Sequence, residues 1–158
     1  MPGADLPGVG ARLRELGITL PAAPKPLGGY VEASQAGSLL FIAGTLPLLN
    51  GKLTISGRLG ENVSIEQGQE AARLAALNAL AAAQEHLGDL NRVKKLVRLN
   101  VHLVTTPQFV EHAKVADGAS ALFVQLFGAS NGHARLVSGF QSLPKGTPVV
   151  TETIFEVE

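Results

Sequence analysis

The stretch of sequence that decides the fold is residues 97–103, VRLNVHL, in which apolar and polar side chains alternate without a break. A period of two is typical of a β-strand, because successive side chains point to opposite faces of a sheet. One face of this strand is therefore apolar and packs on a core. The other face carries Arg98, Asn100 and His102, which are too polar for the interior of a monomer. The alternation predicts a sheet that is covered on one side.

Helical patterns flank this strand in both directions. Upstream, residues 64–88 begin with Ser-Ile-Glu-Gln, a capping-box pattern, and reach a glycine at the far end, where helices commonly stop. Alanine and leucine dominate the residues between them, and both enter a helix at little cost. We expect Leu74, Leu77 and Leu80 to form its core stripe, while the many alanines permit close packing on the sheet.

Downstream, the sequence predicts a second helix that begins at Thr106-Pro107 and continues to residue 127. Threonine suits the N-cap, and proline suits the first helical position because its missing N–H would have no partner there. Small and apolar residues then recur every three or four positions, and we expect them on the buried side. They are Phe109, Ala113, Ala116, Ser120, Phe123 and Phe127.

Four further strands and a short leading helix complete the pattern. The helix is expected at residues 5–17, and the strands at residues 28–33, 38–43, 134–141 and 148–157, with turns at 35–37, 50–51 and 145–146. The order β-β-α-β-α-β-β gives an α+β fold with a mixed sheet, and its two main helices can cover only one face. The remaining face predicts an oligomer, because such a face often packs against copies of itself.

The composition is that of one compact domain. The chain has 158 residues, of which 46% are hydrophobic and only 16% charged, so we interpret residues 1–158 as a single domain with a helical extension at 1–20. Thirteen basic and 13 acidic residues give a formal net charge of +0, so the chain has no excess of positive charge that would attract nucleic acid. Cysteine is absent, which excludes disulfides, thiolate nucleophiles and zinc–cysteine sites.

Several familiar motifs are also absent. The sequence contains no P-loop, no His-Glu-x-x-His and no Gly-x-Ser-x-Gly nucleophile elbow. The four histidines lack the spacing of metal ligands, so we expect no metal site. No apolar run approaches the ~20 residues that cross a bilayer, and the first residues lack the pattern of a secretory signal. A cytoplasmic protein without a membrane partner is therefore expected.

Arg135 is the most informative single residue. Between Asp117 and Glu152 the only other charged side chain is Lys145, so this guanidinium does not belong to an ordinary solvated face. Its planar fork of donors matches a carboxylate or phosphate in two parallel hydrogen bonds. One interpretation is a binding site for a small anion where a loop enters a strand; the other is an interface salt bridge. His133 is either a turn residue or part of the same pocket.

Short motifs in a fixed order carry a family resemblance. They are residues 26–30, PLGGY, residues 41–47, FIAGTLP, and the pair Ala134-Arg135 followed eight residues later by Leu143-Pro144 and a closing strand with acidic residues at its end. With these motifs, residues 24–158 resemble the YjgF/RidA family, also known as endoribonuclease L-PSP-like proteins. The leading helix and the spacing between residues 127 and 135 resemble a longer branch of that family.

The resemblance implies a chorismate-mutase-like fold assembled as a homotrimer, with the sheets forming a central barrel and three pockets at the subunit interfaces. Members with deaminase activity hydrolyse 2-imino and enamine acids, such as 2-iminobutanoate and 2-iminopropanoate, to 2-oxo acids and ammonia, without a cofactor of their own. By position, Arg135 would hold the substrate carboxylate as the central catalytic residue. The other residues implied in the pocket are Tyr30, Gly44, Thr45, His133 and Val137.

The chain departs from the family pattern at Val150, where the active branch carries an acid that is thought to orient the attacking water. Glu152 points to the same strand face and is either a substitute or a structural acid. Three functions therefore stay open. They are a deaminase, a non-catalytic trimeric binder of small carboxylates or oxo acids, and a ribonuclease or translation inhibitor. The neutral charge and the aromatic content of 4% disfavour the third.

Overall fold

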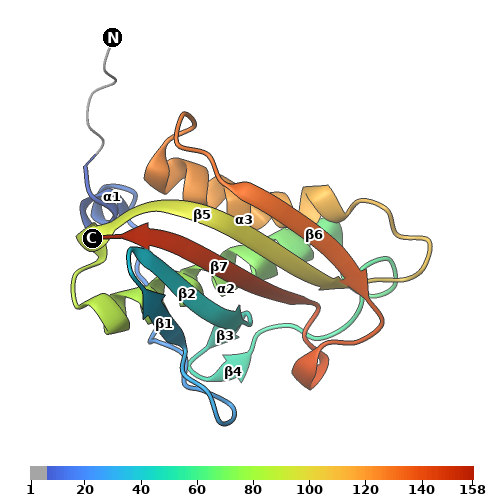
Figure 1. Cartoon of the computed structure of the whole chain (residues 1–158). Helices are drawn as coiled ribbons and strands as arrows, with labels where there is room; N and C mark the ends of the chain where they lie inside the picture. Colours follow the sequence, from blue (N-terminus) through green and yellow to red (C-terminus); the bar gives the residue numbers. More distant parts are fainter. Residues whose placement is uncertain (1–6) are drawn as a thin grey trace.

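The computed structural model describes residues 7–158, which form a five-stranded sheet with helices packed on one face (Figure 1). The strand order is β1-β2-β7-β5-β6, with β5 and β6 parallel and the other pairs antiparallel, which confirms the mixed sheet. The strands are β1 (Ala33–Ala36), β2 (Leu39–Thr45), β5 (Val93–Val104), β6 (Ala134–Phe140) and β7 (Val149–Val157).

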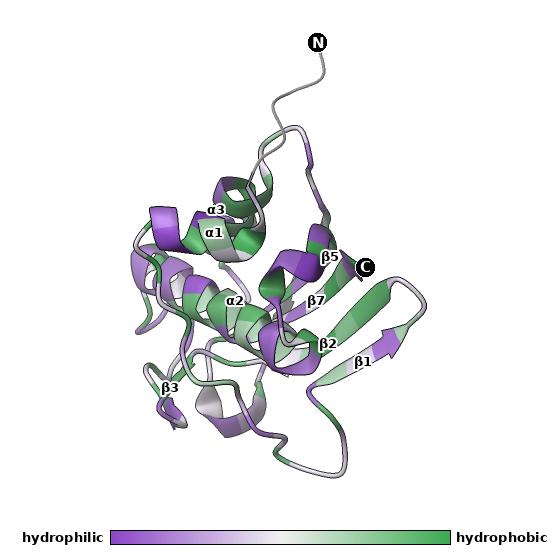
Figure 2. Ribbon diagram, turned by 90° about the vertical axis from the view of Figure 1, so that its left-hand side faces the viewer, coloured by the Kyte–Doolittle hydropathy of each residue, from purple (hydrophilic) through white to green (hydrophobic). Residues whose placement is uncertain are grey.

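Two long helices, α2 (Ile65–Leu87) and α3 (His112–Phe127), cover one face of the sheet, as the sequence predicts (Figures 1 and 2). Between the layers lies the core, where Leu99, Phe123 and Phe155 are at most 1% exposed. The alternation of residues 97–103 is confirmed, because Leu99, Val101 and Leu103 are buried against the helices. The opposite face of the sheet has no covering element within residues 7–158.

The buried face of α2 is built mainly from alanine rather than from the leucine stripe that the sequence predicts. Leu80 is buried, but Leu74 and Leu77 are only half-buried, whereas the alanines closest to the sheet and to α3 are almost fully enclosed. They are Ala72, Ala75, Ala76, Ala79 and Ala83. Small side chains let the backbones of two elements approach closely, so α2 lies tightly against its neighbours.

The capping box predicted at the start of α2 is present. The backbone N–H of Gln67 donates to Ser64 Oγ at 3.1 Å, and the backbone N–H of Ser64 donates to Gln67 Oε1 at 2.9 Å. At the other end, Gly88 has a positive φ of 80° and closes the helix as expected.

Replacing Ser64 with alanine is expected to lower the free energy of unfolding by about 1 kcal/mol, because one N-terminal N–H group loses its acceptor. Chemical denaturation of Ser64→Ala beside Ser130→Ala measures this effect. Ser130 is exposed and lies outside every helix, so its variant should match the parent protein. Equal midpoints for both variants would contradict a stabilising role for the capping box.

The second helix begins at His112 and not at Thr106, so the prediction for its N-terminus is wrong. The backbone beyond β5 stays extended because it pairs with a distant loop: Thr106 N–H donates to the carbonyl of Leu59 at 3.0 Å, and Thr105 forms a bridge with the same residue. This tertiary pairing outweighs the local Thr-Pro start signal. Consequently Phe109 precedes the helix, and Ala113 is exposed instead of buried.

The first strand was also misplaced by the sequence pattern. Residues 27–30 form bends, and β1 occupies Ala33–Ala36, part of which was predicted as a turn. The register explains this, because Ala36 pairs with Leu39, which leaves only Gly37 and Ser38 for the turn. Gly37 has a φ of 60°, as a tight hairpin requires.

Three smaller elements complete the fold. The leading helix α1 spans Val9–Glu15 and is shorter than the predicted 5–17; residues 5 and 6 lie outside the described part of the chain. A hairpin of β3 (Leu48–Leu49) and β4 (Lys52–Leu53) surrounds the predicted 50–51 turn, but its strands were not predicted. Two short 3-10 helices, Leu90–Arg92 and Pro144–Gly146, lie before β5 and β7.

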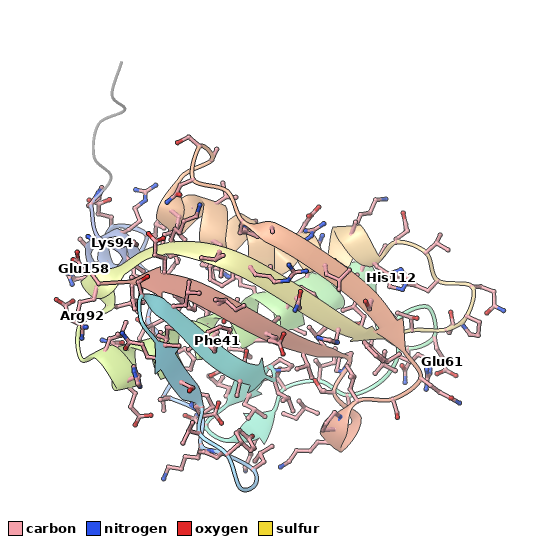
Figure 3. All side chains as sticks on the ribbon, in the orientation of Figure 1. Phe41, Glu61, Arg92, Lys94, His112 and Glu158 are labelled. Atoms are coloured by element: carbon pink, nitrogen blue, oxygen red, sulfur yellow. The ribbon has the colours of Figure 1, made fainter. Side chains whose placement is uncertain are left out.

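Polar contacts fix the end of the chain beside the start of β5 (Figure 3). Arg92 Nε donates to the backbone carbonyl of Glu158 at 2.9 Å, and Lys94 Nζ pairs with the Glu158 carboxylate at 2.9 Å. On the open face of the sheet, the register places Phe41 beside Ile154, and Phe41 is 42% exposed. The open face is therefore partly apolar.

Candidate functional site

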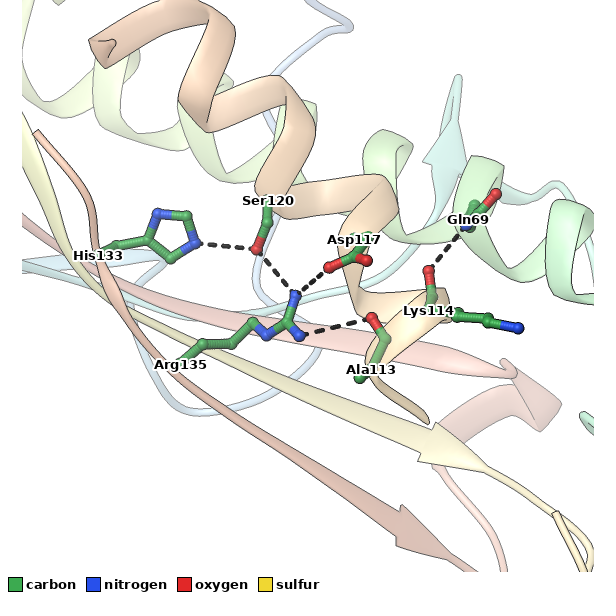
Figure 4. Close-up of polar contacts among 7 residues, drawn as sticks. All are labelled: Gln69, Ala113, Lys114, Asp117, Ser120, His133 and Arg135. Carbon is green, nitrogen blue, oxygen red and sulfur yellow. Dashed lines mark hydrogen bonds and ion pairs between the residues drawn. The ribbon is translucent and has the colours of Figure 1, made fainter. Parts of the chain in front are cut away.

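Arg135 lies on β6 and faces the helices. Its register partner on β5 is Leu99, which is buried under the helix layer, so both side chains point to the same face. The guanidinium reaches α3, where Nη1 donates to Asp117 Oδ1 at 2.7 Å and to Ser120 Oγ at 3.2 Å (Figure 4). Nη2 lies 3.5 Å from the carbonyl of Ala113. Within one chain, Arg135 is thus held by α3.

His133 joins this group through Ser120. Its Nε2 lies 2.9 Å from Ser120 Oγ, and its ring meets Phe123 edge-on with ring centroids 6.1 Å apart. Burial lowers the pKa of His133 below its ordinary value of 6.5, and the positive charge of Arg135 lowers it further. A neutral imidazole is therefore favoured. We call Asp117, Ser120, His133 and Arg135 the Arg135 cluster.

The guanidinium keeps donors for a ligand. Its side chain is 24% exposed, and Nε–H makes no hydrogen bond to any other residue in the range 7–158. The partner Asp117 is 61% exposed and belongs to a helix surface, so water can replace it at modest cost. A small carboxylate that reaches this edge would find both a positive charge and oriented N–H groups.

Three other predicted pocket residues, Tyr30, Gly44 and Thr45, lie on or before β2, which is distant from β6 in the strand order. Tyr30 is 45% exposed, and its hydroxyl accepts the backbone N–H of Leu27 at 3.0 Å. Thr45 is turned into the core, where its hydroxyl donates to the carbonyl of Ala75 at 2.9 Å and lies 2.7 Å from Thr151 Oγ1. A hydroxyl contact from Thr45 to a ligand would require breaking these bonds.

Gly44 permits a close approach between strands. A Cβ at this position would lie 3.1 Å from Val150 Cγ1, which is tighter than ordinary van der Waals contact. The glycine therefore fits the interpretation of a constrained backbone, while its peptide group stays accessible to a ligand on the exposed side.

One chain does not assemble all six candidates. His133, Arg135 and Val137 are on or beside β6, whereas Gly44 is on β2, and β7 and β5 lie between these strands. Three strand spacings of roughly 4.8 Å separate the two groups by about 14 Å. Within one chain, Gly44 and Arg135 therefore do not line a common pocket.

The family model described as "YjgF/chorismate mutase-like, putative endoribonuclease" matches residues 10–152. The chain belongs to the YjgF/RidA family. It is 41% identical over 150 residues to Protein TCP17 of Trypanosoma cruzi, with 94% of each chain covered. A Shewanella oneidensis structure described as a putative endoribonuclease is 34% identical and superposes with a TM-score of 0.90, covering 95% of this chain and 99% of its own.

More distant YjgF/RidA structures share the fold with lower similarity. Escherichia coli TdcF, solved with bound serine, is 21% identical and has a TM-score of 0.62, with 86% of this chain and 94% of TdcF covered. The chain is therefore more similar to TCP17 and the Shewanella protein than to TdcF. Its leading helix, expected for a longer branch, is present as α1.

Glu152 lies on the opposite face of the sheet from Arg135. Its register partner is Asn100, whose Nδ2 donates to Glu152 Oε1 at 2.8 Å, and Arg98 Nε donates to Asn100 Oδ1 at 3.2 Å. The three side chains form a polar row on the open face. Within one copy of this chain, Glu152 therefore cannot orient water at Arg135.

Two members of the Arg135 cluster were not predicted as site residues. The sequence pattern placed Ser120 in a buried stripe. Asp117 was noted only as the last acidic residue before a stretch with few charges. Their spacing of three residues on α3 puts both on one helix face, which is a weak signal. The contact itself depends on how α3 packs against β6, and no local pattern encodes that distance.

A separate cavity of about 540 Å³ lies at the ends of β5 and β6, near Phe140. Its charged wall is Arg58, which already donates to the carbonyls of Thr105 at 3.0 Å and Gln141 at 2.8 Å. Arg58 thus links three backbone segments, and its hydrogen bonds serve the fold. We therefore place the candidate site at Arg135.

Residues 7–158 contain no group of three or more His, Cys, Asp or Glu side chains placed to hold a metal ion. Their helices include none that is both long and apolar enough to span a membrane.

Proposed function

We propose that this chain binds small 2-oxo and 2-imino carboxylates through Arg135 and hydrolyses the imino acids to 2-oxo acids and ammonia. The observation that carries the proposal is the guanidinium of Arg135, which is partly exposed, paired with a single exposed carboxylate, and left with Nε–H unused among the described residues. The reaction needs no cofactor, because the imine carbon is already electrophilic.

A carboxylate ligand would bind by exchange. Asp117 accepts a hydrogen bond from Nη1 of Arg135. An incoming carboxylate would replace it, and the Asp117 side chain would then rotate into solvent. The planar guanidinium can then offer two parallel hydrogen bonds to the ligand. Fixing the carboxylate orients the neighbouring imine carbon, and orientation of this kind supplies much of the acceleration in reactions of pre-positioned groups.

The ligand class is also supported by a relative. TdcF has the same fold and was solved with bound serine, a small molecule that carries a carboxylate beside a nitrogen-bearing carbon. A 2-imino acid shares both features.

We further propose that the chain assembles as a homotrimer in which Tyr30 and Gly44 of one copy face Arg135 of the next. The partly apolar open face of the sheet and the separation of the candidate residues support this arrangement. Light scattering should give a mass near three times 16.4 kDa. A mass of 16.4 kDa at micromolar concentration would contradict the shared pocket.

The second candidate is a trimer that binds carboxylates without turning them over. It is favoured by Val150, which stands where active relatives are expected to carry an acid, and by Glu152, which is committed to Asn100 on the other face. A ribonuclease activity has less support, because the net charge of +0 gives no basic surface for RNA.

The decisive experiment generates 2-iminobutanoate in situ with a threonine dehydratase and follows imine loss with and without the protein. Faster loss that depends on protein concentration supports hydrolysis. Parallel calorimetry with 2-oxobutanoate measures binding alone. Binding without acceleration would select the second candidate, and the absence of both would contradict the proposed site.

Asp117→Asn is expected to tighten 2-oxobutanoate binding roughly two- to fivefold. The amide removes a competing charge from Arg135, and exposed ion pairs are worth about 0.2–1 kcal/mol. Calorimetry at low ionic strength measures the change. The matched control is Glu111→Gln. This change also removes an acid at the start of α3, but Glu111 pairs with Lys114 and not with Arg135. Equal affinities for all three proteins would show that Asp117 does not compete with the ligand.

A further inference from the structure

We propose that Ser120 and His133 form the proton relay of this site: Ser120 Oγ contacts the water that attacks the ligand, and His133 takes and returns the proton through it. This inference rests on the proposed hydrolysis at Arg135. It assigns Ser120 as a catalytic residue and His133 as a positioning residue that acts through Ser120.

The need for such a relay arises from where the acids lie. Position 150 is a valine, and Glu152 is bonded to Asn100 on the opposite face of the sheet. Within residues 7–158, the side chains that accept hydrogen bonds from Arg135 are Asp117 and Ser120. Asp117 is the group that the ligand displaces. The Ser120–His133 pair is then the remaining proton acceptor beside the guanidinium.

The hydrogen bonds run in the order that a relay requires. Arg135 Nη1 can only donate, so Ser120 Oγ accepts that bond at 3.2 Å. The hydroxyl hydrogen of Ser120 is then available to His133 Nε2, 2.9 Å away (Figure 4). A hydroxyl that donates to an imidazole while a cation contacts its oxygen is arranged as in activated serines.

The surroundings keep His133 ready to accept a proton. Phe123 packs edge-on against its ring, and the imidazole is half-buried between α3 and β6. The charged groups of the cluster that bear on it are Arg135 on β6, the strand that begins just after His133, and Asp117 on α3. Burial and the Arg135 charge both lower its pKa, so the neutral form predominates at neutral pH.

The chemistry balances with water as the only co-reactant. As water adds to the imine carbon, its proton passes to Ser120 Oγ and the serine proton passes to His133 Nε2. The proton returns by the same route to the nitrogen, which holds the former C=N π pair, giving a neutral carbinolamine. The relay then moves the hydroxyl proton to nitrogen while the C–N bond breaks. The bonding pair leaves with ammonia, and the carbon becomes the carbonyl of the 2-oxo acid.

The test separates turnover from binding. Ser120→Ala and His133→Asn should each lower kcat for 2-iminobutanoate by about a hundredfold, the scale of general acid–base catalysis. Both should leave the Kd for 2-oxobutanoate within about threefold of the parent protein, since Arg135 is unchanged. Ser120→Thr keeps the hydroxyl and should restore most of the activity. Thermal melts of each variant show whether it is folded.

A pH profile gives a second, independent readout. The kcat of the parent protein should fall as the pH drops through the lowered pKa of His133, below its ordinary value of 6.5, because the protonated ring cannot accept another proton. The His133→Asn variant should lack this acidic limb.

Full activity in folded Ser120→Ala and His133→Asn would overturn the relay and leave the proposed hydrolysis intact. So would a loss of kcat matched by an equal loss of 2-oxobutanoate binding. A parent protein that binds 2-oxobutanoate but does not accelerate imine loss would overturn the relay together with the hydrolysis, while leaving the anion site at Arg135.

Discussion

Arg135→Ala should weaken the binding of 2-oxobutanoate by about a hundredfold and abolish measurable imine hydrolysis. The guanidinium is the only side chain of the Arg135 cluster that carries a fixed positive charge, and its hydrogen bonds to a carboxylate contribute about 1.5–3 kcal/mol each. Arg135→Lys keeps the charge and loses the planar fork, so an intermediate loss is expected. Calorimetry and the coupled imine assay measure the two effects.

Arg98→Ala is the matched control for this experiment. It removes the same charge from the neighbouring strand β5, but its side chain contacts Asn100 on the open face of the sheet. Binding in this variant should stay within about twofold of the parent protein. If Arg98→Ala and Arg135→Ala weakened binding equally, the effect would come from net charge and not from a site at Arg135.

Gly118→Ala should lower the free energy of unfolding by about 2–4 kcal/mol, which corresponds to a fall in Tm of roughly 5–15 °C for a domain of this size. A Cβ at Gly118 of α3 would lie 2.6 Å from the Cα of Gln69 on α2 and closer still to its carbonyl oxygen. Backbone cannot yield as a flexible side chain can, so the two helices would have to separate. The gain in helix propensity, about 1 kcal/mol, offsets only part of this cost.

Gly132→Ala provides the comparison for this stability measurement. Gly132 is exposed, and a Cβ there would meet only the carbonyl of Ala129 at 4.0 Å. Its Tm should stay within about 2 °C of the parent value. A Gly118→Ala protein as stable as Gly132→Ala would show that α2 and α3 can move apart without loss, contrary to their close packing.

The periodic elements of the fold could be predicted from sequence because their signals are local. The alternation of residues 97–103 encodes β5, and the Ser64–Gln67 capping box encodes the start of α2. The failures occur where distant backbone takes part: Thr106 pairs with Leu59, which delays α3 until His112. The local Thr106-Pro107 pattern carries no information about the loop almost fifty residues earlier that keeps this segment extended.

The same difference between local signals and distant contacts decided which site residues could be predicted. Arg135 stood out because charges are scarce around it, and His133 because it is close in sequence. Ser120 and Asp117 could not be selected, since their role depends on the distance between α3 and β6. Glu152 was a reasonable candidate from strand parity, and only the register shows that it faces away from Arg135.

The ion pair between Asp117 and Arg135 would set a threshold for occupancy of the proposed site. A bare arginine would attract chloride, bicarbonate or any passing phosphate, whereas here each competitor must first displace a carboxylate that is tethered to the same protein. A tethered group competes at a high effective concentration. Every anion meets this cost, so a ligand that makes further contacts in the pocket is favoured over an inorganic anion that binds to Arg135 alone. Discrimination against the common anions of the cell would then be a property of the unliganded protein.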